Sequence, residues 1–422
     1  MGVLRLVFAC TVAALLHAFL RSETISGTTI PALNTQLWVA IRGQLSDQVY
    51  AELEALPEVE VISPTGGFSF LGCSEITIHL QWILVMANLE FYTETNQQIH
   101  IQTMRLEPYK PKAKSNNQAR QQSAELDTTL PWNLDRIDQL SNTLNNIYNP
   151  PNTADNIDIY VLDTGVNLAH EEFGGRATRV TAFKDESPCL STAHGSWVAS
   201  IAAGSFYGVA KDANIKDMKL PNGDSCDFYT SDAAAALNYL LLNVDIPFVV
   251  VMSWSAPNTP ALNAILQDLN TKGAVLINAA GNDGDSSLAC LRSPGSSGVT
   301  YSVGSVGRTL VRSSFSNYGT CIDSFAPGEE IIGAGLDSST QLVQGDGTSA
   351  SCPMEGGRAA VLMKQFSLTN PTAVYDALIT YSQKDAVISP GANSPNRFCN
   401  FEGNVVANSP TTSSSSKFNV FL

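Results

Sequence analysis

The sequence predicts an α/β fold with a doubly wound, mostly parallel sheet and helices on both faces, preceded by a small α/β domain. Near-continuous apolar runs, typical of parallel strands buried on both sides, alternate with segments of helical periodicity. The chain has 422 residues, of which 44% are hydrophobic and 15% charged, enough for one large domain and an accessory one. Such alternation predicts right-handed crossovers between parallel strands.

Residues 1–22 have the layout of a secretory signal peptide. A single positive charge precedes the apolar run Leu6–Leu20, and polar residues follow it. The run is too short to favour a membrane span, and a buried N-terminal helix is the alternative interpretation. We therefore expect a secreted, extracellular protein that is not anchored in a membrane. The net charge of −15 argues against nucleic acids and anionic membrane surfaces as partners.

Residues 23–107 predict a small α/β domain. Leu37–Ile41 has the composition of a strand, Ser46–Leu56 has helical spacing with its first serine as a cap, and Val59–Ile62 is a second strand. Residues 66–91 break this pattern with an apolar block, and we interpret them as an irregular insertion. The unit as a whole is interpreted as the start of a pro-segment.

Residues 108–131 are rich in Lys, Gln, Asn and Ser and predict an exposed linker. Proteases cut preferentially in such segments, and we expect a maturation cleavage within Gln118–Thr129. The large domain then spans residues 132–401. Residues 402–422 form a Ser/Thr-rich tail that is predicted to be disordered.

The large domain contains recognisable strands and helices. Buried strands are predicted at Ile157–Leu162, Pro247–Trp254 and Ala274–Ala280, and helices at Ser231–Asn243 and Pro260–Lys272. Ligands of doubly wound sheets bind beyond the carboxyl ends of the strands. Asp163 and Asn282 follow two of these predicted strands, which makes them candidate site residues.

The stretch Gly347–Pro353 predicts a serine nucleophile. Ser349 would open a helix, where unpaired backbone N–H groups surround its hydroxyl and can stabilise an oxyanion. Taken alone, Gly-Thr-Ser is common in turns, and a turn would then be the favoured interpretation. The prediction therefore depends on the polar residues upstream.

A nucleophilic serine needs a base to take its proton and a carboxylate to orient that base. The large domain offers only His170 and His194 as bases. His194 begins an apolar helical run, whereas His170 lies in a polar segment and is predicted in a surface turn. Asp163 ends a buried strand, where a lone carboxylate needs a partner such as an imidazolium. The amide of Asn282 could donate to an oxyanion, although the residue alone would be interpreted as part of a loop.

Together these stretches resemble the subtilisin-like serine proteases, or subtilases, and within them the proteinase K and aqualysin branch. The matching motifs are Val161–Gly165, His194-Gly195, Tyr207–Ala210, Ala279–Asn282, Ser313–Gly319 and Phe325–Gly328. The order Asp, His, Ser is that of subtilisin. The resemblance covers about residues 132–401 and implies a catalytic triad of Asp163, His194 and Ser349, with Asn282 as oxyanion donor. The small domain resembles an inhibitor I9-like pro-segment.

The resemblance also implies where substrate, disulfide bonds and a metal are found. The implied substrate-binding residues are Ser253, Trp254, Ser255, Ala280 and Gly281. The implied disulfide bonds are Cys189–Cys226 and Cys290–Cys321. Eight cysteines fit an oxidising compartment. Cys352 and Cys399 either pair or stay free, and a buried free thiol is favoured for Cys352.

A structural calcium ion is the one cofactor implied. Its ligands would be the Asp323 carboxylate with the backbone carbonyls of Gly298 and Thr300, and hard oxygen ligands suit calcium. The alternative is that Asp323 is a plain surface residue.

Several residues depart from the family's usual motifs. Trp197 lies three residues after the histidine, and Ala350, Met354, Glu355 and Gly356 alter the motif after the serine. These changes leave open the alternative that the chain is a catalytically impaired homologue, which binds peptides or partners without cleaving them. A lipase or esterase is disfavoured, because no Gly-x-Ser-x-Gly motif surrounds the serine. The complete triad favours a monomeric, secreted serine endopeptidase that acts on proteins or peptides and is inhibited by its own pro-segment.

Overall fold

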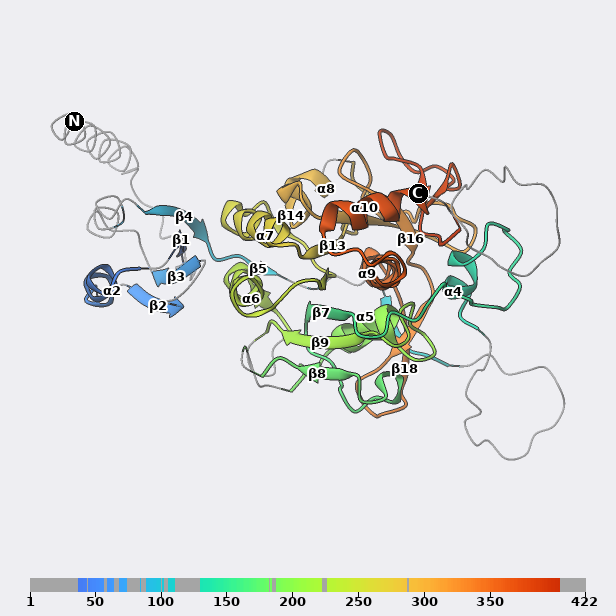
Figure 1. Cartoon of the computed structure of the whole chain (residues 1–422), viewed down its shortest axis with the longest axis horizontal. Coiled ribbons are helices and arrows are strands. Elements are labelled where there is room, and N and C mark those ends of the chain that lie inside the picture. Colours follow the sequence, from blue (N-terminus) through green and yellow to red (C-terminus); the bar gives the residue numbers. More distant parts are fainter. Residues whose placement is uncertain are drawn as a thin grey trace, which may run out of the picture.

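The computed structural model shows a small body and a large body that lie side by side (Figure 1). It describes residues 37–110 and 130–402, except for 44, 57–58, 64–67, 74–83, 85–88, 100, 102–104, 182, 184–186, 222–225 and 287. The expected signal peptide and maturation site lie outside the described residues, as does the tail from residue 403. No described helix is long and apolar enough to cross a membrane.

The described residues of the small body form an antiparallel sheet and the helix α2 (Asp47–Glu54). The strands of this sheet are β1 (Leu37–Arg42), β2 (Val59–Ser63), β3 (Phe68–Cys73) and β4 (Glu90–Thr95), in the order β2-β3-β1-β4. The Ser46 side chain accepts the backbone N–H of Val49, as expected for an N-cap. Val39, Leu53 and Leu71 form the centre of its apolar core.

Part of residues 66–91 is regular, so the expected insertion is wrong for residues 68–73. Strand β3 lies between β1 and β2 and pairs with both, with Val39 opposite Leu71. This strand was not predicted from the sequence, because Ser69 and Gly72 interrupt the apolar run and obscure the two-residue alternation typical of a strand. Residues 74–83 and 85–88 lie outside the described residues.

The large body contains the doubly wound sheet that the sequence predicts. Within the described residues the strand order is β19-β20-β16-β15-β13-β11-β7-β9-β8. The bounds are β7 (Asp158–Asp163), β8 (Ala177–Arg179), β9 (Asn214–Lys219), β11 (Val249–Met252), β13 (Val275–Ala279), β15 (Tyr301–Val306), β16 (Ser324–Pro327), β19 (Gln383–Lys384) and β20 (Arg397–Phe398). All neighbouring strands are parallel except β19, which runs antiparallel to β20.

Helices cover both faces of this sheet (Figure 1). One face packs against α4 (Trp132–Ile137), α5 (His194–Ala203), α9 (Thr348–Phe366) and α10 (Pro371–Thr380), and the other against α6 (Thr230–Asn243) and α7 (Pro260–Lys272). Strand side chains alternate between the two cores: Ile159 and Val161 belong to the first, Tyr160 and Leu162 to the second. This alternation explains why each strand is apolar along its whole length.

Two strand pairs join the small body to the large one. Strand β5 (Gln98–Ile99) pairs antiparallel with β10 (Phe228–Tyr229). Strand β6 (Arg105–Pro108) pairs antiparallel with β18 (Leu342–Asp346), which also pairs with β17 (Ile331–Ala334). Because β6 crosses the expected boundary between residues 107 and 108, the linker begins later than the composition indicated.

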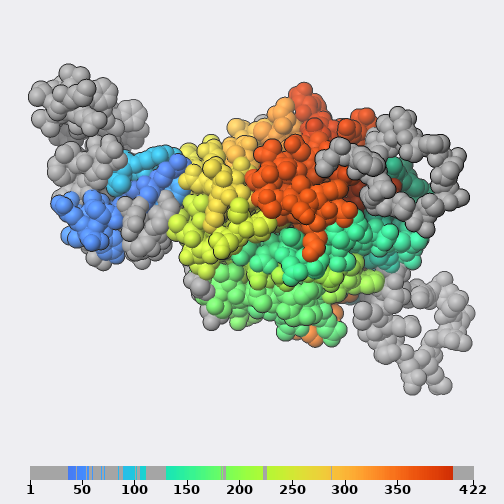
Figure 2. Space-filling view, viewed as in Figure 1, coloured from blue at the N-terminus to red at the C-terminus, as the bar shows by residue number. Residues whose placement is uncertain are grey.

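The small body also packs on the helical face that α6 and α7 form. Phe68 donates its N–H to Asn238 Oδ1 at 3.0 Å, and Asn238 returns a bond to the Phe68 carbonyl at 2.9 Å. Trp38 and Phe68 join the apolar core on this side of the large sheet. The space-filling view shows the blue small body against the yellow and yellow-green surface (Figure 2).

Candidate active site

Asp163 is the last residue of β7 and its carboxylate is held in place. It is 1% exposed, and its Oδ1 accepts the N–H of Thr164 at 2.7 Å and the Thr164 hydroxyl at 3.2 Å. The chain turns sharply after it, because Gly165 has φ +100°. The carboxylate therefore points past the end of the sheet in a fixed orientation.

His194 is the first residue of α5 and contacts this carboxylate. Its Nδ1 lies 2.8 Å from Asp163 Oδ1, and the imidazole is fully buried. The contact requires close approach, since a Cβ on Gly195 would collide with the Gly165 carbonyl oxygen. Nδ1–H donates to the carboxylate, which makes Nε2 the acceptor in the neutral ring. Among the described residues, Nε2 has no hydrogen-bond partner.

Ser349 lies in the first turn of α9, as the sequence predicts. Its hydroxyl donates to the carbonyl of Ser253 at 3.2 Å, and the Ser253 hydroxyl donates to the Ser349 carbonyl at 3.0 Å. No hydrogen bond between Ser349 and His194 is formed in this structure. Catalytic hydrogen bonds are often absent before substrate binds, and rotation about one side-chain bond redirects the hydroxyl.

Asn282 lies beside Ser349 on the loop that follows β13. Its Oδ1 accepts the N–H of Thr348 at 2.9 Å and the Thr348 hydroxyl at 2.8 Å. These two bonds fix the amide, so that Nδ2 lies on the opposite side. Nδ2 is 3.4 Å from the place where a Cβ on Gly347 would be, and Gly347 has φ +149°. The missing side chain keeps this space open.

An Asn282→Ala variant is expected to lower kcat by about 10²–10³, the loss seen when one oxyanion donor is removed in subtilisin. An oxyanion donor acts mainly on the charge that develops in the transition state, so kcat should fall much more than KM changes. Steady-state kinetics on a peptide anilide test this. Asn263→Ala is a matched control, because that amide bonds Asn258 and Ser296 instead. If Asn282→Ala and Asn263→Ala changed kcat and KM to the same extent, the role of Asn282 as an oxyanion donor would be contradicted.

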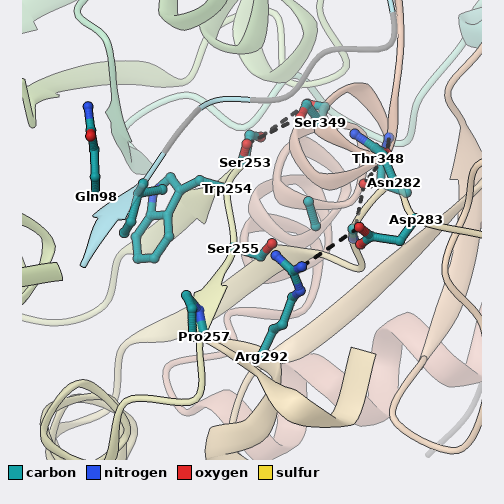
Figure 3. A pocket seen from close by; sticks show the side chains of 13 residues that line it. Gln98, Ser253, Trp254, Ser255, Pro257, Asn282, Asp283, Arg292, Thr348 and Ser349 are labelled. Atoms are coloured by element: carbon teal, nitrogen blue, oxygen red, sulfur yellow. Dashed lines mark hydrogen bonds and ion pairs between the residues drawn. The ribbon is translucent and has the colours of Figure 1, made fainter. Parts of the chain in front are cut away.

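A pocket of about 180 Å³ opens next to Ser349. It is smaller than the roughly 300–1,000 Å³ of typical small-molecule sites and has the size of a subsite for one side chain. It is lined by Gln98, Ile99, Ser253, Trp254, Ser255, Pro257, Ala279, Gly281, Asn282, Asp283, Arg292, Thr348 and Ser349, and Figure 3 shows most of them. Of the five predicted substrate-binding residues, only Ala280 does not line it. The Ala280 carbonyl accepts the side chain of Asn317.

Trp254 connects this pocket to the aspartate. Its Nε1 donates to the Leu162 carbonyl at 2.9 Å, one residue before Asp163. Its ring packs edge-on against Phe228 of β10, with centroids 5.7 Å apart. Trp254 thus fills the space between the end of β11 and β10.

Trp197 is buried between the elements that carry His194 and Ser349. Its Nε1 donates to the Ile331 carbonyl at 3.0 Å, and its ring centroid is 6.0 Å from that of His194. A Cβ on Gly345 of β18 would lie 2.9 Å from the indole. The unusual tryptophan therefore packs α5 against the hairpin that leads into Ser349.

His170 is buried, so its predicted place in a surface turn is wrong. It is 3% exposed, its Nδ1 accepts the N–H of Glu172 at 3.2 Å, and its Nε2 lies 2.8 Å from the Gln341 carbonyl. Both ring nitrogens are thus used in packing a short 3₁₀ turn. Polar neighbours in the sequence hid this burial.

The structure contains both implied disulfide bonds, Cys189–Cys226 and Cys290–Cys321. Cys352 and Cys399 are free and buried, which confirms the favoured interpretation of Cys352. Burial raises the pKa of Cys352 to about 12. This thiol is therefore protonated and unreactive near neutral pH, although it lies three residues after Ser349.

A buried carboxylate–imidazole pair at the end of a doubly wound sheet, with a serine at a helix N-terminus beside a pocket, is the arrangement of a serine hydrolase site. A subtilase family model matches residues 154–400. The match covers more than half of the sequence, and the chain belongs to the subtilase family.

Similar proteins agree with this assignment. The extracellular serine proteinase of Thermus sp. (strain Rt41A) is 34% identical over 271 residues, which are 63% of this chain and 64% of the relative. The alkaline serine exoprotease A of Vibrio alginolyticus is 35% identical over 268 residues, which are 63% of this chain and 49% of the relative. The chain thus spans less than two thirds of these relatives' length.

A solved structure is similar as well. The crystal structure of a cold adapted subtilisin-like serine proteinase has a TM-score of 0.61 and 32% sequence identity, and the match covers 65% of this chain and 99% of that one. Its coverage agrees with the extent of the large body.

Several site residues were not predicted from the sequence, among them two threonines and two charged residues. Thr164 and Thr348 orient Asp163 and Asn282, and both follow or precede a predicted site residue directly. Asp283 and Arg292 are the charged residues among those lining the pocket. The sequence offered only their positions as a signal: Asp283 directly follows Asn282, and Arg292 lies two residues after Cys290.

Proposed function

We propose that this protein is a secreted serine endopeptidase that is synthesised as a zymogen. The observation that carries the proposal is the 2.8 Å contact between Asp163 and His194 at the edge of the sheet, with Ser349 on α9 beside a pocket. Because the relatives are longer than the matched region, their activity is carried over only as part of this proposal.

His194 Nε2 takes the proton of Ser349 Oγ as that oxygen attacks the carbonyl carbon of a peptide bond. The negative oxygen of the tetrahedral intermediate accepts from the Ser349 N–H and from Asn282 Nδ2. Asp163 stabilises the imidazolium. The C–N bond breaks as His194 returns the proton to the leaving amine, and an acyl-enzyme remains. Water then attacks with the same base, releasing the acid.

The contacts of the small body support its role as an intramolecular inhibitor. Extended peptides bind such enzymes by adding a strand to an exposed edge. Strand β5 occupies the edge of β10, and β6 occupies the edge of β18, which leads directly into Ser349. A substrate could use these edges only after the pro-segment has left them.

The small body also caps two helices of the large one, which supports an additional role in folding. The Glu94 carboxylate accepts the N–H of Ala261 at 3.2 Å in the first turn of α7. The Asn96 side-chain oxygen accepts the N–H of Ser231 at 3.2 Å in the first turn of α6. Thr259, which occupies the N-cap position of α7, makes no capping bond and donates to the Pro257 carbonyl instead. One N–H in the first turn of each helix thus finds its acceptor in the pro-segment.

Secretion is supported by the two disulfide bonds, which persist in oxidising compartments. A relative described as extracellular agrees with it. We propose a monomer as the simplest active form, because the pocket and the Asp163–His194 pair are built from one chain.

The decisive experiment uses the full precursor and its Ser349→Ala form, both treated with a fluorophosphonate probe. Wild type should be labelled covalently and convert itself to a shorter form, and the variant should do neither. A Ser351→Ala variant is a matched control, because its hydroxyl donates to the Ala326 carbonyl away from the pocket. Absence of both labelling and processing in folded wild type would refute the proposal.

We further propose a calcium ion held by Asp323 and the carbonyls of Gly298 and Thr300. Asp323 is partly buried, and its Oδ2 accepts the N–H of Ser302 at 2.7 Å, which places the carboxylate near the backbone that follows Thr300. The donors are all oxygen atoms, as calcium prefers. No described group of three His, Cys, Asp or Glu side chains could hold a metal, so carbonyls and water must complete the ligand set.

Removing calcium is expected to lower Tm by roughly 5–10 °C, because binding at about 100 times Kd stabilises the native state by about 2.7 kcal/mol. Thermal unfolding of the Ser349→Ala protein with calcium or EGTA measures this without self-digestion. Asp323→Asn should abolish the difference, and Asp376→Asn, an exposed residue on α10, should keep it. An Asp323→Asn protein that still responds to calcium would contradict the site.

A further inference from the structure

Two opposite charges line the pocket beside Ser349, and the mechanism above uses neither. They are Asp283 and Arg292, with Arg292 Nη2 at 3.7 Å from Asp283 Oδ1. Figure 3 shows the Arg292 side chain reaching toward Asp283, close to Ser255. Any substrate side chain that enters the pocket meets this pair.

The backbone of Arg292 is fixed from both sides. Strand β14 (Arg292–Ser293) pairs antiparallel with β12 (Ala256–Pro257), and Arg292 lies opposite Pro257. The preceding helix α8 (Leu288–Leu291) is tied down by the Cys290–Cys321 disulfide. Ser293 is fully buried and donates to Asn263 Oδ1 at 2.7 Å. The guanidinium is therefore presented to the pocket from a rigid base.

The two charges are held differently. The Asp283 backbone N–H donates to Asn317 Oδ1 at 3.1 Å, and Asn317 Nδ2 donates to Asp283 Oδ2 at 3.2 Å. Asn317 is itself fully buried, so it fixes the carboxylate to the wall. The guanidinium makes no hydrogen bond to a described residue, because its one ion pair is longer than 3.5 Å.

We infer that Arg292 determines the residue before the scissile bond and favours a side chain that ends in a carboxylate, above all glutamate. An arginine offers five N–H donors, and a planar fork suits a carboxylate in particular. Before a substrate binds, the negative charge of Asp283 offsets the cost of holding the Arg292 guanidinium partly out of water. The side chain of Arg292 is 31% exposed, so a substrate can reach it once strand β5 of the pro-segment, which supplies Gln98 and Ile99 to the pocket wall, has left. This inference rests on the proposed peptidase function.

The experiment uses the matured enzyme and four peptide anilides that differ only in the residue before the scissile bond: Glu, Gln, Lys or Phe. Wild type should show kcat/KM for Glu about tenfold or more above that for Lys. Arg292→Gln should lower the value for Glu by about ten- to a hundredfold, the range of a charge-assisted hydrogen bond, and leave Phe within about twofold. Asp283→Asn should raise the ratio of Glu to Gln, because it removes the competing carboxylate.

Lys364→Gln is the control for loss of one positive charge. Lys364 lies near the end of α9, about 22 Å along the helix from Ser349, and should leave the ratios unchanged. Active sites are counted by fluorophosphonate labelling, so misfolded variant protein does not enter the rates. If labelled wild type prefers Lys, or if Arg292→Gln cleaves after Glu as fast as wild type, the inference is wrong and the peptidase function stands. If folded wild type is not labelled, both fall together.

Discussion

Replacing His194 by alanine is expected to lower kcat about a millionfold, the loss measured for the equivalent single replacement in subtilisin. Without the imidazole, no group can take the proton of Ser349 as its oxygen attacks. Asp163→Ala should cost less, roughly 3 × 10⁴, because the base remains but loses its orientation. The measurement is kcat on a peptide anilide, corrected for folded protein.

Two controls separate this chemistry from a general loss of structure. The double variant His194→Ala/Ser349→Ala should be no slower than either single variant, since the residues act as one unit. His170→Ala removes a histidine that is equally buried and bonded to the Gln341 carbonyl. It should lower stability and leave kcat of the folded fraction unchanged. A millionfold loss in His170→Ala, or a small loss in His194→Ala, would contradict the assignment of His194 as base.

The sequence predicts the parts of this site whose chemistry is local. Asp163 at the end of an apolar strand and His194 at the start of an apolar helix were identified by position, and the structure brings them to 2.8 Å. The helix that begins before Ser349 follows from the glycine and threonine that precede it. In each case a change of periodicity marks the end of an element, and parallel strands gather such ends at one edge.

What could not be predicted depends on contacts between distant segments. Ile99 pairs with Phe228, and Leu106 pairs with Gly345, although neither short segment has a strand pattern of its own. The Ser349 hydroxyl donates to Ser253 rather than to His194, which is a choice among side-chain rotamers. Arg292 reaches the pocket only because β14 pairs with β12. The hydrophobic periodicity of a segment indicates whether it forms a helix or a strand, but it does not indicate which other segment it will pair with.

Within α9 itself, the unusual Glu355 forms a buried ion pair with Arg358. Glu355 and Arg358 are both fully buried, and Arg358 Nε lies 2.9 Å from Glu355 Oε2, although the angle is not that of a hydrogen bond. Ser324 donates to Glu355 Oε1 at 2.6 Å, and Arg358 donates to the Asn400 carbonyl at 2.8 Å and to the Leu378 carbonyl. Burial lowers the pKa of Arg358, but the interactions with Glu355, Cys399 and Tyr301 together raise it by more, and the net shift is upward.

Glu355→Ala is expected to lower the free energy of unfolding by about 3–5 kcal/mol, because it leaves the Arg358 charge buried without a counter-charge. Arg358→Ala should cost a similar amount for the converse reason. Urea denaturation in a Ser349→Ala background measures both without self-digestion. Lys364→Ala is the control on the same helix, since its ion pair with Asp155 is exposed and should contribute at most about 1 kcal/mol.

The double variant Glu355→Leu/Arg358→Met should recover most of this loss, because neither charge is then left buried alone and the two apolar side chains fill similar space. A cost near the sum of the single variants would mean that the bonds to Ser324, Asn400 and Leu378 matter more than the pairing of charges. A cost below about 1 kcal/mol for Glu355→Ala would show that water reaches Arg358 and that the pair is not buried in solution. Recovery by the double variant would instead show that the pair stabilises the fold because each charge compensates the other. The two charges lie six and nine residues after the nucleophile on the same helix.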